Sequence, residues 1–151
     1  MVDLKGQYNK IKDQIDTAVI QTIESTSFIN GPIVKEFSKS LEQYLGVKHV
    51  IPCANGTDAL FIALKTLEIG PGDEVIVPAV SWSTTYFPLQ QFGLKLKFVD
   101  IDLDTLNYDL EMLESAITSD TRMIMVVNLL GNPNSFDDIN SFIKDKNIFI
   151  F

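Results

Sequence analysis

Residues 53–60 are the stretch whose residue types best suit binding chemistry, because small and polar side chains there join the apolar run 49–52 to a helical pattern. A turn that leaves a strand and enters a helix directs free backbone N–H groups outward, and such groups bind anions. Gly56 permits a backbone conformation closed to residues with a Cβ, and Asn55 can cap the helix start. The pattern fits either an ordinary strand-to-helix turn or an anion site on Gly56 and Thr57.

Composition narrows the possible partners. The chain has 151 residues, 46% of them hydrophobic, and its 12 Lys and Arg against 20 Asp and Glu give a net charge of −8, which argues against nucleic acid or a polybasic membrane contact. A single cysteine and a single histidine argue against a disulfide and a Cys/His metal site. With no signal-peptide pattern and no apolar run of roughly 18 residues, we expect a cytoplasmic protein with no metal and no membrane span.

Helical and strand-like patterns alternate along the chain and predict an α/β fold built from right-handed βαβ units. The run 74–78 is continuously apolar and β-branched after its first residue, as in parallel strands covered on both faces. The helix at 57–67 is apolar almost all round and is expected to be buried. Helices are predicted over 8–25, 33–45, 57–67, 86–92, 110–117 and 135–144, and strands over 49–52, 74–78, 96–99, 123–127 and 148–151.

Three segments, 30–32, 55–60 and 70–78, together resemble the DegT/StrS family of pyridoxal 5'-phosphate (PLP)-dependent nucleotide-sugar aminotransferases. The resemblance covers essentially the whole chain. It implies a three-layer α/β sandwich with a mostly parallel sheet, the large domain of the fold-type I PLP-dependent transferases, and a homodimer that shares its active sites. Residues 1–32 would form a helical arm with a substrate loop, and residues 33–151 an incomplete PLP-binding domain that stops within a strand.

The resemblance also assigns cofactor contacts. It places the PLP phosphate on the backbone of Gly56 and Thr57, in agreement with the anion site suggested by the turn. It places Trp82 against the pyridine ring, where a flat indole can stack, although a lone tryptophan after a strand also fits core filling or a rim contact. Asn128 matches a position where the family often has a histidine near the cofactor, and a capping or loop-fixing amide is the alternative.

The remaining polar candidates have weaker patterns. Asn30 and Gly31 match a loop that contacts substrate in the family, and a plain turn between helices explains them nearly as well. His49 and Cys53 are expected to be strand residues without a chemical role, and residues 100–104 a solvated acidic loop.

The resemblance implies a parent enzyme that transfers an amino group, usually from glutamate, to a keto nucleotide sugar in polysaccharide, lipopolysaccharide or deoxyamino-sugar biosynthesis. The Schiff-base lysine and the aspartate that pairs with the pyridine nitrogen are expected beyond Phe151, so no residue here is assigned a catalytic role and the chain alone should be inactive. Segments 82–91 and 127–134 are more similar to the sugar 3-dehydratases, which carry histidine in place of that lysine. A non-catalytic binding or assembly protein on the same fold is a third possibility.

Overall fold

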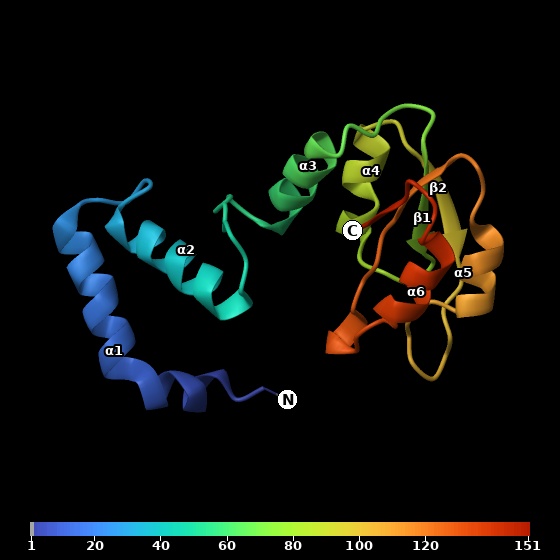
Figure 1. Ribbon diagram of the computed structural model, residues 1–151. Coiled ribbons are helices and arrows are strands. Elements are labelled where there is room, and N and C mark those ends of the chain that lie inside the picture. Colours follow the sequence, from blue (N-terminus) through green and yellow to red (C-terminus); the bar gives the residue numbers. More distant parts are fainter. Residues whose placement is uncertain (1) are drawn as a thin grey trace. The chain divides into compact units, whose positions relative to one another are not determined.

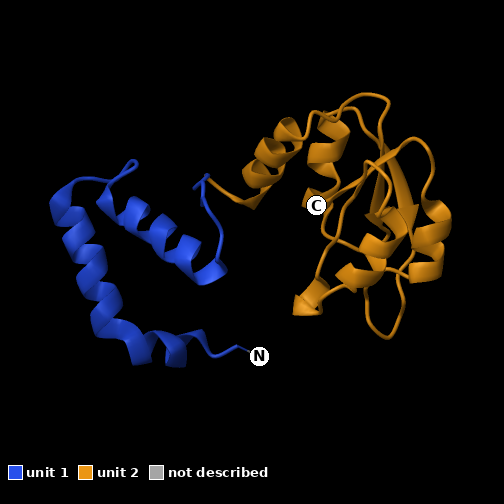
Figure 2. Cartoon of the chain, viewed as in Figure 1, with its two compact units in different colours: residues 1–53 blue, residues 54–151 orange. Residues whose placement is uncertain are grey.

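The chain forms two compact units that adjoin in the sequence between Cys53 and Ala54 (Figure 2). The computed structural model describes residues 2–151. The first unit is helical, and the second combines helices with a sheet. The boundary between the units therefore lies about twenty residues after the expected boundary at 32/33. The roles expected for residues 1–32, a helical arm with a substrate loop, and for residues 33–151, an incomplete PLP-binding domain, stay predictions.

Two helices make up the first unit. Helix α1 spans Leu4–Ser25 and begins where the side chain of Asp3 accepts a hydrogen bond of 2.8 Å from the N–H of Gly6. Helix α2 spans Pro32–Leu45 and ends at Gly46, whose φ of 67° is the left-handed conformation common at helix C-termini. Both helices were expected, and Asp3 starts α1 four residues earlier than the apolar spacing predicted.

The strand expected over 49–52 is wrong, because these residues form neither strand nor helix. A strand requires partners for its backbone groups. Here the N–H of Val50 donates instead to the Glu42 carboxylate of α2, at 3.1 Å. His49 and Cys53 are accordingly exposed loop residues.

The second unit contains one sheet in the order β2-β1-β3-β4, with every pair parallel. This confirms the predicted α/β class and its parallel sheet. The strands are β1 (Glu74–Pro78), β2 (Lys95–Val99), β3 (Thr121–Ile124) and β4 (Phe149–Ile150), and the helices are α3 (Gly56–Thr66), α4 (Phe87–Gln91), α5 (Leu110–Ala116) and α6 (Phe136–Ile143), with 3₁₀ turns η1 (Ser83–Thr85) and η2 (Leu129–Gly131).

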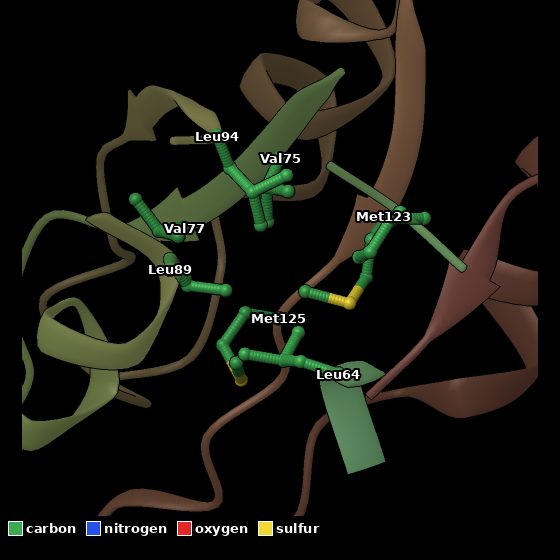
Figure 3. Close-up of a cluster of buried hydrophobic side chains, with 8 residues drawn as sticks. Leu64, Val75, Val77, Leu89, Leu94, Met123 and Met125 are labelled. Atoms are coloured by element: carbon green, nitrogen blue, oxygen red, sulfur yellow. The ribbon is translucent and has the colours of Figure 1, made fainter. Parts of the chain in front are cut away.

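Helices cover both faces of this sheet (Figure 1). Successive residues of a strand point to opposite faces, so Val75 and Val77 of β1 belong to one core cluster and Ile76 to the other. The first cluster, drawn in Figure 3, takes Leu64 from α3. The second cluster takes residues from α5 and α6. Two clusters on either side of one sheet make the three layers that were expected.

Helix α3 buries less of its surface than its sequence suggested. Leu64 is its only buried residue, and Ile62 is 47% exposed, so the expectation that this helix is buried against the sheet rather than on the surface is wrong. The physical reason is its place in an outer layer, where a helix buries only the stripe that faces the sheet.

Candidate functional site

The strand order creates a topological switch point at the carboxyl edge of the sheet. From β1 the chain passes to α4, beside the Leu64 cluster, whereas from β3 it passes to α6, which packs on the opposite face. Adjacent strands that send their chains to opposite faces form a topological switch point, where open α/β sheets bind ligands. The segments that leave β1 and β3 contain Trp82 and Asn128.

The N-terminus of α3 belongs to the same edge. Residues 67–73 connect the C-terminal end of α3 to the amino end of β1, so α3 begins toward the carboxyl edge. Asn55 caps the helix by accepting a 2.9 Å hydrogen bond from the N–H of Asp58. The N–H groups of Gly56 and Thr57, at the first two helical positions, have no acceptor within the helix, as at any helix start.

Gly56 has a different role from the one expected. It lies in helical backbone outside the left-handed region, so the expectation of a conformation closed to other residues is wrong. A Cβ built on Gly56 would meet no atom within 4 Å. The space beside the Gly56 Cα is therefore open, which fits the approach of a phosphate group to the backbone.

Two charges act at this helix start. The helix dipole places about half a positive charge there, which favours an anion. The carboxylate of Asp58, in the first turn, accepts a 3.1 Å hydrogen bond from the Asn55 amide and adds a negative charge close by. Because these two charges oppose each other, the directed N–H groups rather than net charge are the feature of this helix start that suits an anion.

Trp82 lies in a loop whose backbone is held by hydrogen bonds, while its ring is exposed. The Tyr86 hydroxyl donates to the carbonyl of Pro78 at 2.7 Å, and the hydroxyls of Ser81 and Thr85 lie 2.8 Å apart. The N–H of Thr85 donates to the carbonyl of Trp82 at 2.9 Å. Trp82 itself is 75% exposed, which contradicts core filling and leaves the indole face available to a ligand or a partner surface.

Asn128 is exposed, and its Oδ1 accepts hydrogen bonds from Asn134, at 3.1 Å from the backbone N–H and at 3.2 Å from Nδ2. The loop-fixing role weighed for Asn128 is therefore present in the structure. Its Nδ2 remains available to a bound group.

Two tyrosines, Tyr108 buried and Tyr86 partly buried, stabilise the same edge. The hydroxyl of Tyr108 donates to the carbonyl of Met125 at 2.7 Å, and burial raises the pKa of Tyr108 far above its usual value, with a smaller contribution from Tyr86. Burial also raises the pKa of Tyr86, against the opposing effect of a hydrogen bond from Ser81. Both phenols stay protonated donors at neutral pH.

Asn30 and Gly31 lie in the first unit, before α2. Asn30 is exposed with φ of 52°, and Gly31 precedes Pro32 at the start of the helix. A Cβ on Gly31 would lie 2.0 Å from the carbonyl oxygen of Ser27, so glycine is required there by packing alone. A substrate role for this loop stays a prediction.

Sequence patterns missed the residues that support the site. The pattern predicts a plain loop at Asn134, and Tyr108 lies between predicted elements. A signal for Tyr108 was available, because one aromatic residue between the polar Asn107 and Asp109 suggests a buried anchor. Asn134 had no comparable signal, since asparagine is ordinary in turns.

Among residues 2–151, no group of three or more His, Cys, Asp or Glu side chains is arranged to hold a metal ion. In the acidic loop, Asp102 accepts hydrogen bonds from the hydroxyl and the N–H of Thr105, and the hydroxyl bond is the main cause of its lowered pKa. No helix in this range has the length and hydropathy needed to cross a bilayer.

The sequence of residues 9–151 matches the profile of the DegT/DnrJ/EryC1/StrS aminotransferase family. It is 49% identical over 139 residues to a GDP-4-keto-6-deoxy-D-mannose 3-dehydratase of Yersinia pseudotuberculosis, covering 88% of this chain and 35% of the relative. It is 43% identical over 140 residues to a UDP-2-acetamido-2-deoxy-3-oxo-D-glucuronate aminotransferase of Pseudomonas aeruginosa, covering 93% and 39%.

The fold is similar to a solved enzyme of the same kind. The Escherichia coli GDP-4-keto-6-deoxy-D-mannose-3-dehydratase with bound hydrated PLP superimposes with a TM-score of 0.85 and 44% identity, over 89% of this chain and 36% of that one. The chain thus spans a little over a third of the length of these relatives.

Proposed function

Because the chain belongs to the DegT/DnrJ/EryC1/StrS aminotransferase family, we propose that it is the phosphate-holding part of a PLP-dependent enzyme that transfers an amino group to a keto nucleotide sugar. One observation carries the proposal. The carboxyl edge of the sheet has a switch point between β1 and β3, and α3 begins toward that edge with open space before Gly56. PLP with its phosphate at a helix start suits such an edge.

Each residue of the proposed site has a separate task. The N–H groups of Gly56 and Thr57 bind the phosphate, and the exposed indole of Trp82 stacks on the pyridine ring. Asn128 offers a side-chain N–H to the cofactor or the substrate. Bound PLP supplies an electron sink for charge that develops on the substrate, whereas these residues hold and orient it.

A second candidate, 3-dehydration of a keto nucleotide sugar, has comparable support. The 49% identity to the Yersinia 3-dehydratase extends over 88% of this chain. Both reactions need the same phosphate site and the same ring contact. The residues of the proposed site therefore serve amino transfer and 3-dehydration equally.

The proposal also covers the amino donor, the assembly and the cellular location expected from the family. We propose glutamate as the amino donor, a homodimer as the assembly, and the cytoplasm as the location of an enzyme that makes sugars for surface polysaccharides such as lipopolysaccharide. The loop with Asn30 and Gly31 would contact the nucleotide sugar. If the parent protein binds PLP but converts no sugar, it is instead a non-catalytic binding or assembly protein.

Replacing Trp82 tests the ring contact. In the complete gene product, Trp82→Ala should weaken PLP binding by roughly three- to tenfold, since aromatic stacking contributes about 0.5–1.5 kcal/mol. Trp82→Phe should retain most of the affinity. The measurement is a titration followed by cofactor absorbance.

Tyr44, an aromatic residue of α2 that is 85% exposed, provides the control, and Tyr44→Ala should bind PLP as the unsubstituted protein does. Equal affinities for Trp82→Ala and Tyr44→Ala would remove Trp82 from the site. A protein that does not bind PLP saturably would overturn the proposed function as a whole.

The product separates the two reactions. The complete gene product is incubated with PLP, glutamate and GDP-4-keto-6-deoxymannose or a UDP-linked 3-keto amino sugar, and the sugar is analysed by mass spectrometry. A gain of an amino group in place of the keto oxygen supports amino transfer. Replacement of the C-3 hydroxyl by hydrogen with the ketone retained, a net loss of one oxygen atom at the expense of glutamate, which leaves as 2-oxoglutarate and ammonia, supports the dehydratase.

A further inference from the structure

Asn134 is buried beneath the segment that leaves β3, and it uses its whole side chain. It is 6% exposed. Its Nδ2 donates to the carbonyl of Val127 at 2.9 Å and to Oδ1 of Asn128 at 3.2 Å, and its Oδ1 accepts from the N–H of Tyr108 at 3.3 Å. A fully satisfied buried amide of this kind holds its neighbours in one arrangement.

This network determines how Asn128 presents its amide. Oδ1 of Asn128 accepts two hydrogen bonds from Asn134, one from the backbone and one from the side chain. Rotating the Asn128 amide would place its NH₂ group against these donors and lose both bonds. The acceptor is therefore held toward Asn134, and Nδ2 is the part of Asn128 left to bind another group.

The partners of Asn134 are themselves fixed to the sheet. Tyr108, whose N–H binds Asn134, also donates its hydroxyl to the carbonyl of Met125, directly after β3. The turn between Asn128 and Asn134 is strained, because Leu130 has φ of 54°, a left-handed conformation that disfavours leucine. Such a turn keeps its shape only where surrounding contacts determine it.

We infer that Asn134 is a positioning residue, which sets the amide of Asn128 so that Nδ2 is the donor offered to an acceptor atom of the cofactor or substrate. The inference rests on the proposed function for its ligand, but the orientation of Asn128 belongs to this chain alone. Asn134 acts through Asn128 and needs no contact with the ligand.

Asn134→Asp keeps the size of the side chain and its acceptor for Tyr108 but removes the NH₂ donor. In the complete gene product we expect PLP binding to weaken roughly three- to tenfold, the loss of about one hydrogen bond. Asn132→Asp is the matched control. Asn132 is an exposed amide of the same loop whose Nδ2 donates to Thr105 at 2.8 Å, so that variant should bind PLP within about twofold of the parent.

A double variant separates positioning from general destabilisation. If Asn134 acts through Asn128, adding Asn134→Asp to Asn128→Ala should weaken PLP binding no further, although the urea midpoint still falls. An undiminished effect in the Asn128→Ala background, or equal affinities for Asn134→Asp and Asn132→Asp, would overturn the inference.

A measurement without cofactor keeps this inference separate from the proposed function. The side-chain amide of Asn128 should give one sharp NMR signal with restricted motion in the parent protein and an averaged, mobile signal in Asn134→Asp. An Asn128 amide that is mobile in both proteins contradicts the inference even if PLP binds. A failure of PLP binding with an ordered Asn128 contradicts only the proposed ligand.

Discussion

Tyr108 connects the loop 100–109 to the chain directly after β3 through one hydroxyl group. The residue is 4% exposed, and its hydroxyl donates to the carbonyl of Met125 at 2.7 Å. Burial disfavours the phenolate, so the pKa of Tyr108 is raised far above that of a free tyrosine. The neutral hydroxyl is thus part of the folded structure.

This raised pKa predicts a loss of stability in alkali. In the unfolded chain Tyr108 ionises near pH 10, whereas in the folded protein its ionisation is suppressed to higher pH. The stabilising contribution is complete below about pH 10 and falls as pH rises above that value. Urea unfolding at a series of pH values should show a steep decline for the parent protein.

Tyr108→Phe should flatten that decline, because the group that must stay protonated is gone. At pH 7 the same change should lower the unfolding free energy by about 0.5–1.5 kcal/mol for the lost hydrogen bond. Tyr44→Phe, at an 85% exposed position, is the control and should keep the parent's pH dependence. A Tyr108→Phe curve parallel to the parent above pH 10 would show that another group causes the decline.

At the scale of elements, Leu64 is the anchor that holds α3 against the sheet. It is fully buried with Val75, Val77 and Met123, as Figure 3 shows. Leu64→Ala should lower the unfolding free energy by about 2–5 kcal/mol through lost burial and the cavity left behind. The measurement is urea denaturation followed by circular dichroism.

Ile62→Ala, on the same helix but 47% exposed, should cost less than about 1 kcal/mol. Similar losses for the two variants would mean that α3 packs on the sheet through a different face. Because α3 also carries Gly56 and Thr57, Leu64→Ala should further reduce PLP affinity, whereas Ile62→Ala should not.

The elements were predictable where local pattern and tertiary packing agree. Glu74–Pro78 was predicted to the residue as a strand, because a buried parallel strand is apolar on both faces and Gly70 and Pro71 mark the turn before it. The run at 49–52 was wrong because apolar content alone does not supply a pairing partner. The burial of α3 was wrong because composition does not tell which side of a helix meets the sheet.

The candidate site was predictable only in part. Gly56, Thr57 and Trp82 were singled out by the turn and by the family pattern, and the structure gives them an open helix start and an exposed ring. Their binding role stays a prediction. Asn134 was not predictable, since its function depends on hydrogen bonds to Tyr108 and Asn128 that only the folded chain brings together.

At the scale of the whole molecule, the division into two units predicts where the chain is cut first. Residues 47–55 contain neither helix nor strand, and Lys48 among them is exposed. Proteases prefer exposed segments that lack backbone hydrogen bonds. Brief digestion with trypsin should therefore cleave after Lys48 before the sheet is attacked, with the fragments identified by mass spectrometry.

Lys48→Gln should remove that first cut and leave later ones in place. First cleavage after Lys95 or Lys97, both in β2, would contradict the division, because it would make the sheet less stable than the connection between the units.

The strand order also has a consequence for how the protein is made. β1 pairs with β2 on one side and with β3 on the other, and β3 follows β2 in the chain. During synthesis β1 and β2 can pair first, while the second edge of β1 stays open until α5 and β3 have emerged. Since parallel pairing requires a long connection to close, this interval is long compared with hairpin formation. During this interval the unpaired edge of β1 is the surface most prone to aggregation. A ribosome-associated chaperone would protect this edge.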